Sequence, residues 1–324
     1  MNMLGNENDT FQYWGEYWLS KKRNKVCYSQ YRNLKCYLNH TYDFIGNMPI
    51  KDIKPDNIDN LLDELTVINP NTNRPSSHQY LVNVRNVAYD VFEYAIDNDV
   101  IGKNPAKHRE ISKYAPKKHR RSLTNIEQKL ILVTPHRARI GALIMMFAGL
   151  RKGELIPLTW DDIDLDNFRI KVIKSVAEIR PNHFIVKNGT KTTSEGRMVS
   201  IPLDLAIEID EARKSSSSMY VCPKKDGTMQ SPTSWQNMWK NYIKTIIDLN
   251  PCASSTDIKE ITPHFLRHTY ATLLYKAGID VVTASKLMGH SNIKTTVNIY
   301  THFDDMTVVR SVDKLDDYIS QNLL

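Results

Sequence analysis

Apolar residues recur at three- and four-residue spacing along most of the first hundred residues, the spacing that places them on one face of a helix. Residues 11–19 (FQYWGEYWL) open an aromatic-rich helical stretch, and a second helix is expected to end near Gly46. Asp56 is the expected N-cap of a third helix and Ser77 that of a fourth. The apolar positions of the last three helices are Tyr31, Leu34, Tyr37, Leu38, Ile58, Leu61, Leu62, Leu65, Leu81, Val84, Val87, Ala88, Val91 and Ala95. The pattern predicts a compact four-helix unit.

The second half of the chain mixes helical periodicity with short β-rich runs. A mostly helical region opens at Leu123 and continues to Leu158. Three runs rich in β-branched residues follow, and their proximity predicts one small antiparallel sheet. The runs are residues 168–173 (FRIKVI), 183–187 (HFIVK) and 197–202 (RMVSIP). Helical patterns resume near Leu203, so the expected fold class is mainly α with a small antiparallel β-sheet.

Residues 103–121 (KNPAKHREISKYAPKKHRR), called the basic segment below, separate the two regions. Glu110 is the single acidic residue of the segment, and Pro105 and Pro116 interrupt any long helix. The eight basic residues are Lys103, Lys107, Arg109, Lys113, Lys117, Lys118, Arg120 and Arg121. Taken alone, such a run is either a solvated interdomain linker or a strap across DNA phosphates.

Composition narrows the class of protein. Lys and Arg total 43 against 36 Asp and Glu, a formal net charge of +7 over 324 residues, which hints at a polyanionic partner. A hydrophobic content of 41% with 24% charged residues is typical of a globular chain and argues against a disordered one. The four cysteines are scattered without a C-x-x-C pair, so neither a disulfide framework nor a zinc knuckle is expected.

No stretch of the sequence predicts membrane insertion or secretion. The longest apolar run, residues 140–150, is too short to span a bilayer. The N-terminal sequence MNMLGNENDT lacks both the positive region and the apolar core of a signal peptide. We therefore expect a cytoplasmic protein with no membrane partner.

Four separated segments concentrate residues suited to phosphodiester chemistry: GLRKGEL (149–155), TKTTSEGR (190–197), HFLRHTYAT (264–272) and LMGHSNIKTTVNIYTH (287–302). His264 and Arg267 are three residues apart, so a helix places them on one face. Gly289 follows an apolar pair, a position suited to the turn after a helix. Arginine forks can neutralise phosphate oxygens, and a tyrosine, whose pKa is near 10, becomes a nucleophile only with a base or a cationic pocket.

In this order, the four segments resemble the tyrosine recombinase (phage integrase) family. The resemblance implies a catalytic set of Arg151, Lys191, His264, Arg267, His290 and the nucleophile Tyr300. In the implied reaction the tyrosine cleaves DNA through a 3′-phosphotyrosyl bond while the arginines clamp the phosphate. His264 handles the proton, His290 donates a hydrogen bond to a non-bridging oxygen, and Lys191 protonates the leaving 5′-oxygen. A free 5′-hydroxyl reverses the step, so no metal, ATP or other cofactor is expected.

Some of these residues, and others near them in sequence, allow alternative roles. Lys187 competes with Lys191 for the role of acid because both flank one turn, and the family pattern favours Lys191. His264 and His268 have the i, i+4 spacing of a zinc site, but Phe265 stands where the H-E-x-x-H motif has its glutamate. We therefore expect no metal and interpret His268 as a buried, hydrogen-bonded residue beside the catalytic groups.

The resemblance also assigns domains. Residues 1–105 would form a helical core-binding (SAM-like) DNA-binding domain, 106–121 a basic interdomain linker, and 122–324 the catalytic domain, with a partner helix at about 307–324. The N-terminal wording that supports this is IGNMPIKDIKP and AIDNDVIGKNP. Because two such domains would clamp DNA, phosphate contact by the basic segment becomes the favoured interpretation. The expected DNA-binding residues are Lys113, Lys117, Lys118, Arg120, Arg121 and Arg197, the last with a structural role as its alternative. Glu154 is expected to orient the catalytic groups.

The implied partners are double-stranded DNA recombination sites and further copies of the chain, with an accessory DNA-bending or directionality factor as an open option. Val308, Val312, Leu315 and Ile319 form an apolar stripe through which the last helix would dock in a dimer or tetramer. Only about ten residues precede the first helix, so no arm-binding domain is expected. The expected function is integration or excision of a mobile element by a bacterial or phage-encoded, nucleoid-associated recombinase. Dimer resolution of chromosomes or plasmids and a non-catalytic DNA-binding regulator remain alternatives.

Overall fold

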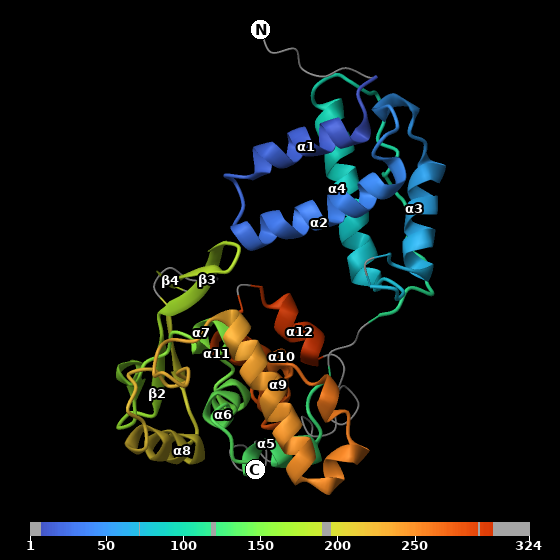
Figure 1. Ribbon diagram of the computed structural model, residues 1–324. Helices are drawn as coiled ribbons and strands as arrows, with labels where there is room; N and C mark the ends of the chain where they lie inside the picture. Colours follow the sequence, from blue (N-terminus) through green and yellow to red (C-terminus); the bar gives the residue numbers. More distant parts are fainter. Residues whose placement is uncertain (1–7, 71, 118–120, 190–195, 291, 301–324) are drawn as a thin grey trace, which may run out of the picture. The chain divides into compact units, whose positions relative to one another are not determined.

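The computed structural model describes residues 8–70, 72–117, 121–189, 196–290 and 292–300. The chain divides into two compact units, Met1–His119 with Glu178–His183, and Arg120–Ala177 with Phe184–Leu324. Both are mainly helical, and the strands form small antiparallel sheets (Figure 1). No helix in the described ranges is long and apolar enough to cross a membrane.

The first unit is built on α1 (Phe11–Lys22), α2 (Tyr28–Ile45), α3 (Pro55–Val67) and α4 (His78–Ile96), with a short 3-10 turn, η1 (Ile50–Asp52), before α3. Ser77 caps α4 as expected, because its hydroxyl accepts from the Tyr80 amide. The expected cap Asp56 is wrong: α3 begins earlier, and Asp56 lies in its first turn. The amide of Lys54 donates to Asn57 Oδ1 (2.8 Å), and Pro55 takes the first helical position, where no amide hydrogen is needed.

The core of this unit combines aliphatic side chains with buried aromatic rings. Phe11, Trp14, Leu38 and Phe92 are fully buried, and the rings of Phe11 and Phe92 lie 5.0 Å apart. Burying a side chain of this size stabilises the fold by about 1.5–3 kcal/mol. The apolar faces predicted for the four helices are therefore the faces that meet.

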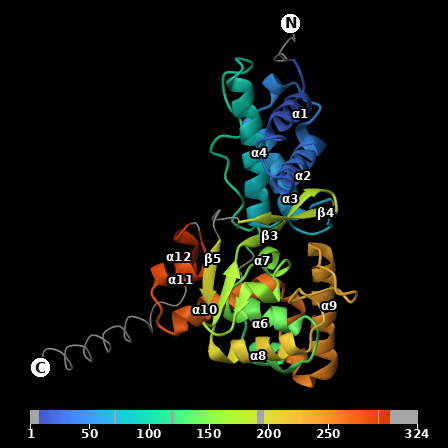
Figure 2. The ribbon, with the colours of Figure 1, turned by 90° about the vertical axis from the view of Figure 1, so that its left-hand side faces the viewer.

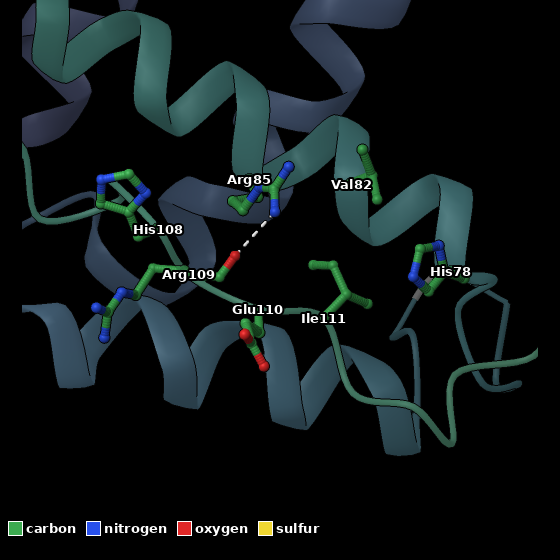
Figure 3. A pocket seen from close by; sticks show the side chains of 7 residues that line it. All are labelled: His78, Val82, Arg85, His108, Arg109, Glu110 and Ile111. Carbon is green, nitrogen blue, oxygen red and sulfur yellow. Dashed lines mark hydrogen bonds between the residues drawn. The ribbon is translucent and has the colours of Figure 1, made fainter.

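Much of the basic segment packs on this unit, which therefore extends past the boundary expected at residue 105. Ala106 and Ala115 belong to its core. The His78 amide donates to Pro116 O (2.9 Å), and Arg85 Nη1 donates to Arg109 O (2.8 Å). Figure 3 shows the second contact across an open cavity of about 570 Å³ between α4 and residues 108–111. These contacts hold the segment along α4 rather than leaving it a free linker.

The second unit is built around one buried helix, α6 (Arg139–Phe147). It contains α5 (Asn125–Val133), α6 (Arg139–Phe147), α7 (Lys152–Leu155), α8 (Leu203–Lys214), α9 (Pro232–Leu249), α10 (Pro263–Lys276), α11 (Val281–Met288) and α12 (Lys294–Tyr300), with 3-10 turns η2 (Trp160–Asp162), η3 (Pro251–Ser255) and η4 (Ile258–Glu260). Residues 141–146 of α6 are all buried, and α6 packs against α10 and α8 (Figures 1 and 2). The chain that leaves α6 therefore starts from a fixed position.

The strands form two sheets, so the single predicted sheet is wrong. β1 (Ile163–Asp164), β2 (Arg169–Val172) and β5 (Arg197–Ser200) make one sheet in the order β1-β2-β5, with Ile170 opposite both Ile163 and Val199. β4 (His183–Asn188) pairs instead with β3 (Lys174–Arg180), a strand that the sequence pattern did not predict. Because β5 is bonded directly to β2, its first residue, Arg197, has a fixed position in the second unit.

Candidate active site

Two glycine turns form the frame of the site. Gly149 follows α6 with φ +66°, and Gly289 ends α11 with φ +62° and ψ +48°. This left-handed conformation favours glycine. The neighbours leave no room for a side chain either: a Cβ at Gly289 would lie 2.8 Å from Arg197 Cδ, and one at Gly149 would collide with the Tyr270 ring. The turn at Gly289, expected from sequence, is completed by the His290 amide, which donates to Ser285 O (3.0 Å).

Arg267 bonds to both turns from α10. Its guanidinium donates to Gly149 O and to Met288 O, the second at 2.5 Å, and only 3% of the residue is exposed. Burial, and then the charge of Arg151, lower its pKa to about 9, so it remains a cation at neutral pH. These two bonds to described residues use two of the five N–H groups of an arginine.

Arg151 reaches the same turn from the start of α7. Its Nη2 donates to Gly289 O (2.7 Å), and its Nη1 donates to Glu154 Oε1 (2.8 Å). The Arg151 amide also donates to Glu154 Oε2 (2.9 Å), which closes the first turn of α7. About a quarter of the Arg151 side chain is exposed, so this guanidinium is both held in place and open to a ligand.

Glu154 binds two arginines at once. Arg197 donates from Nη1 to Oε1 (2.9 Å) and from Nη2 to Oε2 (2.8 Å), the same two oxygens that accept from Arg151. Burial alone would raise the pKa of the carboxyl, but the hydrogen bonds and charges of Arg197 and Arg151 outweigh it and hold the pKa at about 2. The carboxylate is therefore ionised throughout the working pH range.

His290 follows the Gly289 turn and is held by α12. Its Nδ1 shares a hydrogen bond with Thr296 Oγ1 (2.7 Å), and Thr296 is fully buried. Burial, followed by the charges of Arg267, Arg151 and Arg197, lowers the pKa of His290 to about 4. The ring is thus neutral at pH 7. If Thr296 donates to Nδ1, the ring proton sits on Nε2, which then remains for a substrate oxygen.

His264 and His268 lie on α10 near this cluster. His264 is exposed in the first turn, and its charge contributes to the lowered pKa of His290. Together with Arg267 it lies on one helix face, as the spacing predicted. His268 is half-buried, and its carbonyl accepts from Thr272 Oγ1 (3.3 Å). Within the described ranges no group of three or more His, Cys, Asp or Glu residues is arranged to hold a metal ion.

Family models match both units. The model of the phage integrase family matches residues 116–306, more than half of the chain, and the model of the N-terminal SAM-like domain of phage integrases matches residues 10–66. This chain belongs to the phage integrase family. The predicted family and fold class are therefore confirmed: a SAM-like core-binding domain is followed by an integrase catalytic domain.

Curated relatives of this integrase-family chain match it at low identity. A "Tyrosine recombinase XerC-like" protein of Caldanaerobacter subterraneus subsp. tengcongensis is 27% identical over 252 residues, which cover 70% of this chain and 63% of the relative. The ICEBs1 integrase of Bacillus subtilis is 24% identical over 255 residues, covering 75% and 67%. The matched part is thus less than two thirds of the first relative's length.

Solved structures share the fold. The integrase of transposon Tn1549, residues 82–397, in complex with a circular intermediate DNA has a TM-score of 0.79 at 20% identity and covers 94% of this chain and 99% of that one. A λ integrase tetramer bound to a Holliday junction has a TM-score of 0.61 at 16% identity, covering 87% and 78%. At these identities the likeness concerns the arrangement of elements.

The remaining members of the predicted catalytic set are Tyr300, of which the structure describes the backbone, and Lys191, which it does not describe. Tyr300 is the last residue of α12, which packs against α10 and α11, but its side chain lies outside the described part of the structure. Lys191 also lies outside the described residues. Its competitor Lys187 is exposed on β4. The structure thus gathers Arg151, Arg267 and His290 and places the helix that carries Tyr300 beside them.

The five predicted DNA-binding residues of the basic segment fall into three groups. Lys113 and Lys117 are exposed, whereas Lys118 and Arg120 lie outside the described residues. Arg121 binds the fully buried Glu127 through both Nη atoms, at 2.6 and 2.7 Å, so its guanidinium is anchored in the second unit.

Arg197 requires a correction. Its side chain is only 10% exposed and its fork is occupied by Glu154, so a direct DNA contact does not fit its position. The structural role, which was predicted as the alternative for Arg197, fits this position, whereas Thr296 was not predicted as part of the site. Arg197 is the first residue of a predicted strand, and the sequence signal at Thr296 is a hydroxyl four residues before the candidate nucleophile.

Proposed function

We propose that this protein is a site-specific DNA recombinase that cleaves and rejoins DNA through a 3′-phosphotyrosyl intermediate and a Holliday junction. The observation that carries the proposal is the cluster of Arg151, Arg267 and His290 around the Gly149 and Gly289 turns, next to the helix that ends at Tyr300. Two guanidiniums and a neutral histidine can bind the non-bridging oxygens of one phosphodiester and stabilise the charge that develops during attack.

The proposed step exchanges one ester for another. Tyr300 Oη attacks the phosphorus, the bond to O5′ breaks, and the DNA 3′ end becomes joined to the tyrosine. The phenol proton leaves by way of His264 or water, and Lys191 supplies a proton to O5′. No bond energy is lost, so the 5′-hydroxyl of a partner strand can reverse the reaction. We propose that neither ATP nor a metal takes part.

Integration or excision of a mobile element is the role we favour. The names of relatives and fold neighbours include the ICEBs1 integrase, an integrase of Staphylococcus phage L54a and the Tn1549 transposon integrase, which supports it. The λ integrase tetramer on a Holliday junction likewise supports assembly of several copies on DNA, and we propose residues 307–324 as the segment through which copies dock. Those residues lie outside the described part of the chain. Dimer resolution uses the same chemistry on a resident site, and a regulator would bind DNA without cleaving it.

A nicked-substrate assay tests the proposal. Duplex DNA enriched from a random library by binding to the protein is nicked near the site, so that the cleaved fragment diffuses away and traps the intermediate. Wild type should form an adduct that resists denaturant, and Tyr300→Phe should bind the DNA but form none. An adduct that persists in Tyr300→Phe would place the nucleophile elsewhere, and no adduct in wild type would favour the regulator.

The role of Lys191 has its own test on the same DNA. Lys191→Ala should slow cleavage of the normal phosphodiester, because the alkoxide leaving group needs a proton. A substrate with sulfur in place of O5′ should restore the rate, since a thiolate leaves without an acid. Lys187→Ala is the matched control, and a sulfur rescue of that variant would transfer the acid role to Lys187.

A further inference from the structure

Arg197 is a buried arginine at the start of β5, next to the candidate active site. It is the first residue of β5 and follows Gly196, whose φ is +80°. Its side chain is nine-tenths buried, so its positive charge is held inside the unit rather than at the surface. Burying a charge is costly unless a partner of opposite sign binds it with good geometry. Both Nη atoms bind Glu154, one on each carboxylate oxygen, which provides such a partner.

The same carboxylate binds Arg151, so the three side chains form one charge cluster. Each Glu154 oxygen accepts two hydrogen bonds: Oε1 from the Nη1 atoms of both arginines, and Oε2 from the Arg151 amide and Arg197 Nη2. Two arginines and one carboxylate leave the cluster with a single net positive charge. Without Arg197 the buried Glu154 would neutralise Arg151 by itself, and the pair would have little net attraction for a phosphate.

Arg197 also supports the turn that presents His290. A Cβ at Gly289 would meet its Cδ and Nε at 2.8 Å and its Cζ at 3.1 Å, so the guanidinium lies directly against the turn. The carbonyl of that glycine accepts the second bond from Arg151. One side chain thus touches both the carboxylate that orients Arg151 and the backbone to which Arg151 is bonded.

We propose that Arg197 is a positioning residue for the phosphate-binding cluster: it neutralises Glu154 so that the charge of Arg151 remains available, and it supports the Gly289 turn. The inference rests on the proposed recombinase function for its rate effects and on the structure alone for its electrostatic effect. Its buried fork cannot reach DNA directly, so the role is exerted through Arg151 and His290.

The first test separates positioning from DNA binding. Arg197→Ala should lower the single-turnover cleavage rate on nicked DNA about 10- to 100-fold, the range for outer partners of a functional group. Its affinity for the same DNA should stay within about twofold of wild type, because the affinity for DNA comes from many phosphate contacts and Arg197 makes none of them. Arg139→Ala is the matched control, since Arg139 forms an equivalent two-bond pair with Glu208 (2.7 and 2.6 Å) outside the site, and it should keep the wild-type rate. Equal losses in affinity and rate would overturn the proposal.

A second variant tests the charge argument and guards against misfolding. In Arg197→Ala the uncompensated Glu154 captures Arg151, so adding Glu154→Gln should restore part of the lost rate. Two structural defects would instead add, and a double variant slower than Arg197→Ala would overturn the proposal. Arg197→Lys keeps the charge without the fork and should fall between wild type and Arg197→Ala.

An NMR titration gives a readout that needs no cleavage. The charged groups that act on His290 are Arg267, Arg151, Arg197 and His264. In Arg197→Ala the ring of His290, assigned with His290→Gln, should titrate at least about one pH unit higher than in wild type, because a nearby positive charge is lost. An unchanged midpoint would overturn the inference even if the protein cleaves DNA. A shifted midpoint in a protein that forms no adduct would leave the inference standing and contradict the recombinase function.

Discussion

His290 and Glu154 have pKa values shifted by the same two arginines. In Glu154 the arginines stabilise the charged form, and the pKa falls to about 2. In His290 burial and the neighbouring arginines oppose the charged form, and the pKa falls to about 4. One cluster of positive charge therefore keeps a carboxylate ionised and a histidine neutral, a combination suited to holding a phosphate without an additional charge on His290.

The lowered pKa of His290 predicts how stability depends on pH. The folded protein resists protonating His290 until pH 4, whereas the unfolded chain takes up the proton near the ordinary value of 6.5. The free energy of unfolding should therefore fall as the pH decreases from 6.5 to 4. His290→Gln cannot titrate and should show a smaller decrease in urea unfolding measured at pH 7 and pH 4.5. Equal decreases in both proteins would contradict the lowered pKa.

Thr296 tests whether the neutral histidine must also be oriented. Thr296→Val keeps the shape of the side chain but removes the hydroxyl bonded to Nδ1, so the ring proton is no longer directed to Nε2. We expect cleavage to slow about 10-fold or more, with Thr296→Ser close to wild type. The rate of adduct formation measures this, and a Thr296→Val protein as fast as wild type would exclude the role.

For single residues, the sequence predicts which side chains have suitable chemistry more reliably than it predicts which partners they bind. The spacing of His264 and Arg267 predicted a shared helix face, and α10 has it. Arg197 and Arg121 look alike in sequence, as arginines beside predicted phosphate contacts. The structure shows both bound to buried glutamates, 43 and 6 residues away in sequence, and such partners are set by tertiary packing.

Among the elements, α11 and its closing turn have a geometry that the backbone and the neighbouring side chains restrict closely. Gly289 is left-handed, its amide ends the helix by donating to Lys286 O (3.0 Å), and its carbonyl binds Arg151. The sequence predicted this turn because Gly after an apolar helix end is a common stop signal. It could not predict that a cationic side chain packs on the glycine from β5.

Gly289→Ala and Gly227→Ala separate backbone strain from collision. Both glycines have positive φ, +62° and +81°, but a Cβ at Gly227 meets nothing within 4 Å whereas one at Gly289 meets Arg197. Each substitution should cost about 1–2 kcal/mol in the free energy of unfolding from the left-handed backbone. Only Gly289→Ala should also abolish adduct formation. If Gly227→Ala lost as much activity, the collision with Arg197 would not be the cause.

The strands show where local patterns are insufficient. β2 and β5 pair although 24 residues separate Val172 from Arg197, and residues 174–188 between them form the β3–β4 hairpin. β3 has five half-buried residues in succession, so it lacks the alternation that identifies a strand. Pairing across such an insertion depends on the packing of the whole unit, which explains why the sequence predicted one sheet rather than two.

Over the whole molecule, the charge surplus is used in two different ways. Lys113 and Lys117 of the basic segment are exposed, as the proposed phosphate contact requires, while Arg109 pairs with Asp59 (3.0 Å) and Arg121 with Glu127. Counting charges along the sequence cannot distinguish these cases. The two-unit organisation was predictable, but the end of the first unit was not, because Ala106 and Ala115 carry no signal that they are buried.

Salt dependence tests this division. Replacing Lys113 and Lys117 with Gln should reduce the slope of log affinity against log salt by about 0.9 for each DNA phosphate that the protein no longer neutralises. Arg121→Gln should leave that slope unchanged and instead lower the free energy of unfolding by about 1–3 kcal/mol, since Glu127 loses its partner. DNA-binding isotherms between low and moderate salt, with denaturant unfolding of each variant, measure both effects. A slope that changes only in Arg121→Gln would reverse the assignment.

The most direct test of the recombinase function is the chemical identity of the protein–DNA bond. The adduct formed on nicked DNA is digested with protease and nuclease, and the linked peptide is sequenced by mass spectrometry. We predict a nucleotide joined through its 3′-phosphate to Tyr300, and a free 5′-hydroxyl on the released strand. Attachment to another residue, or through a 5′-phosphate, would contradict the proposed mechanism.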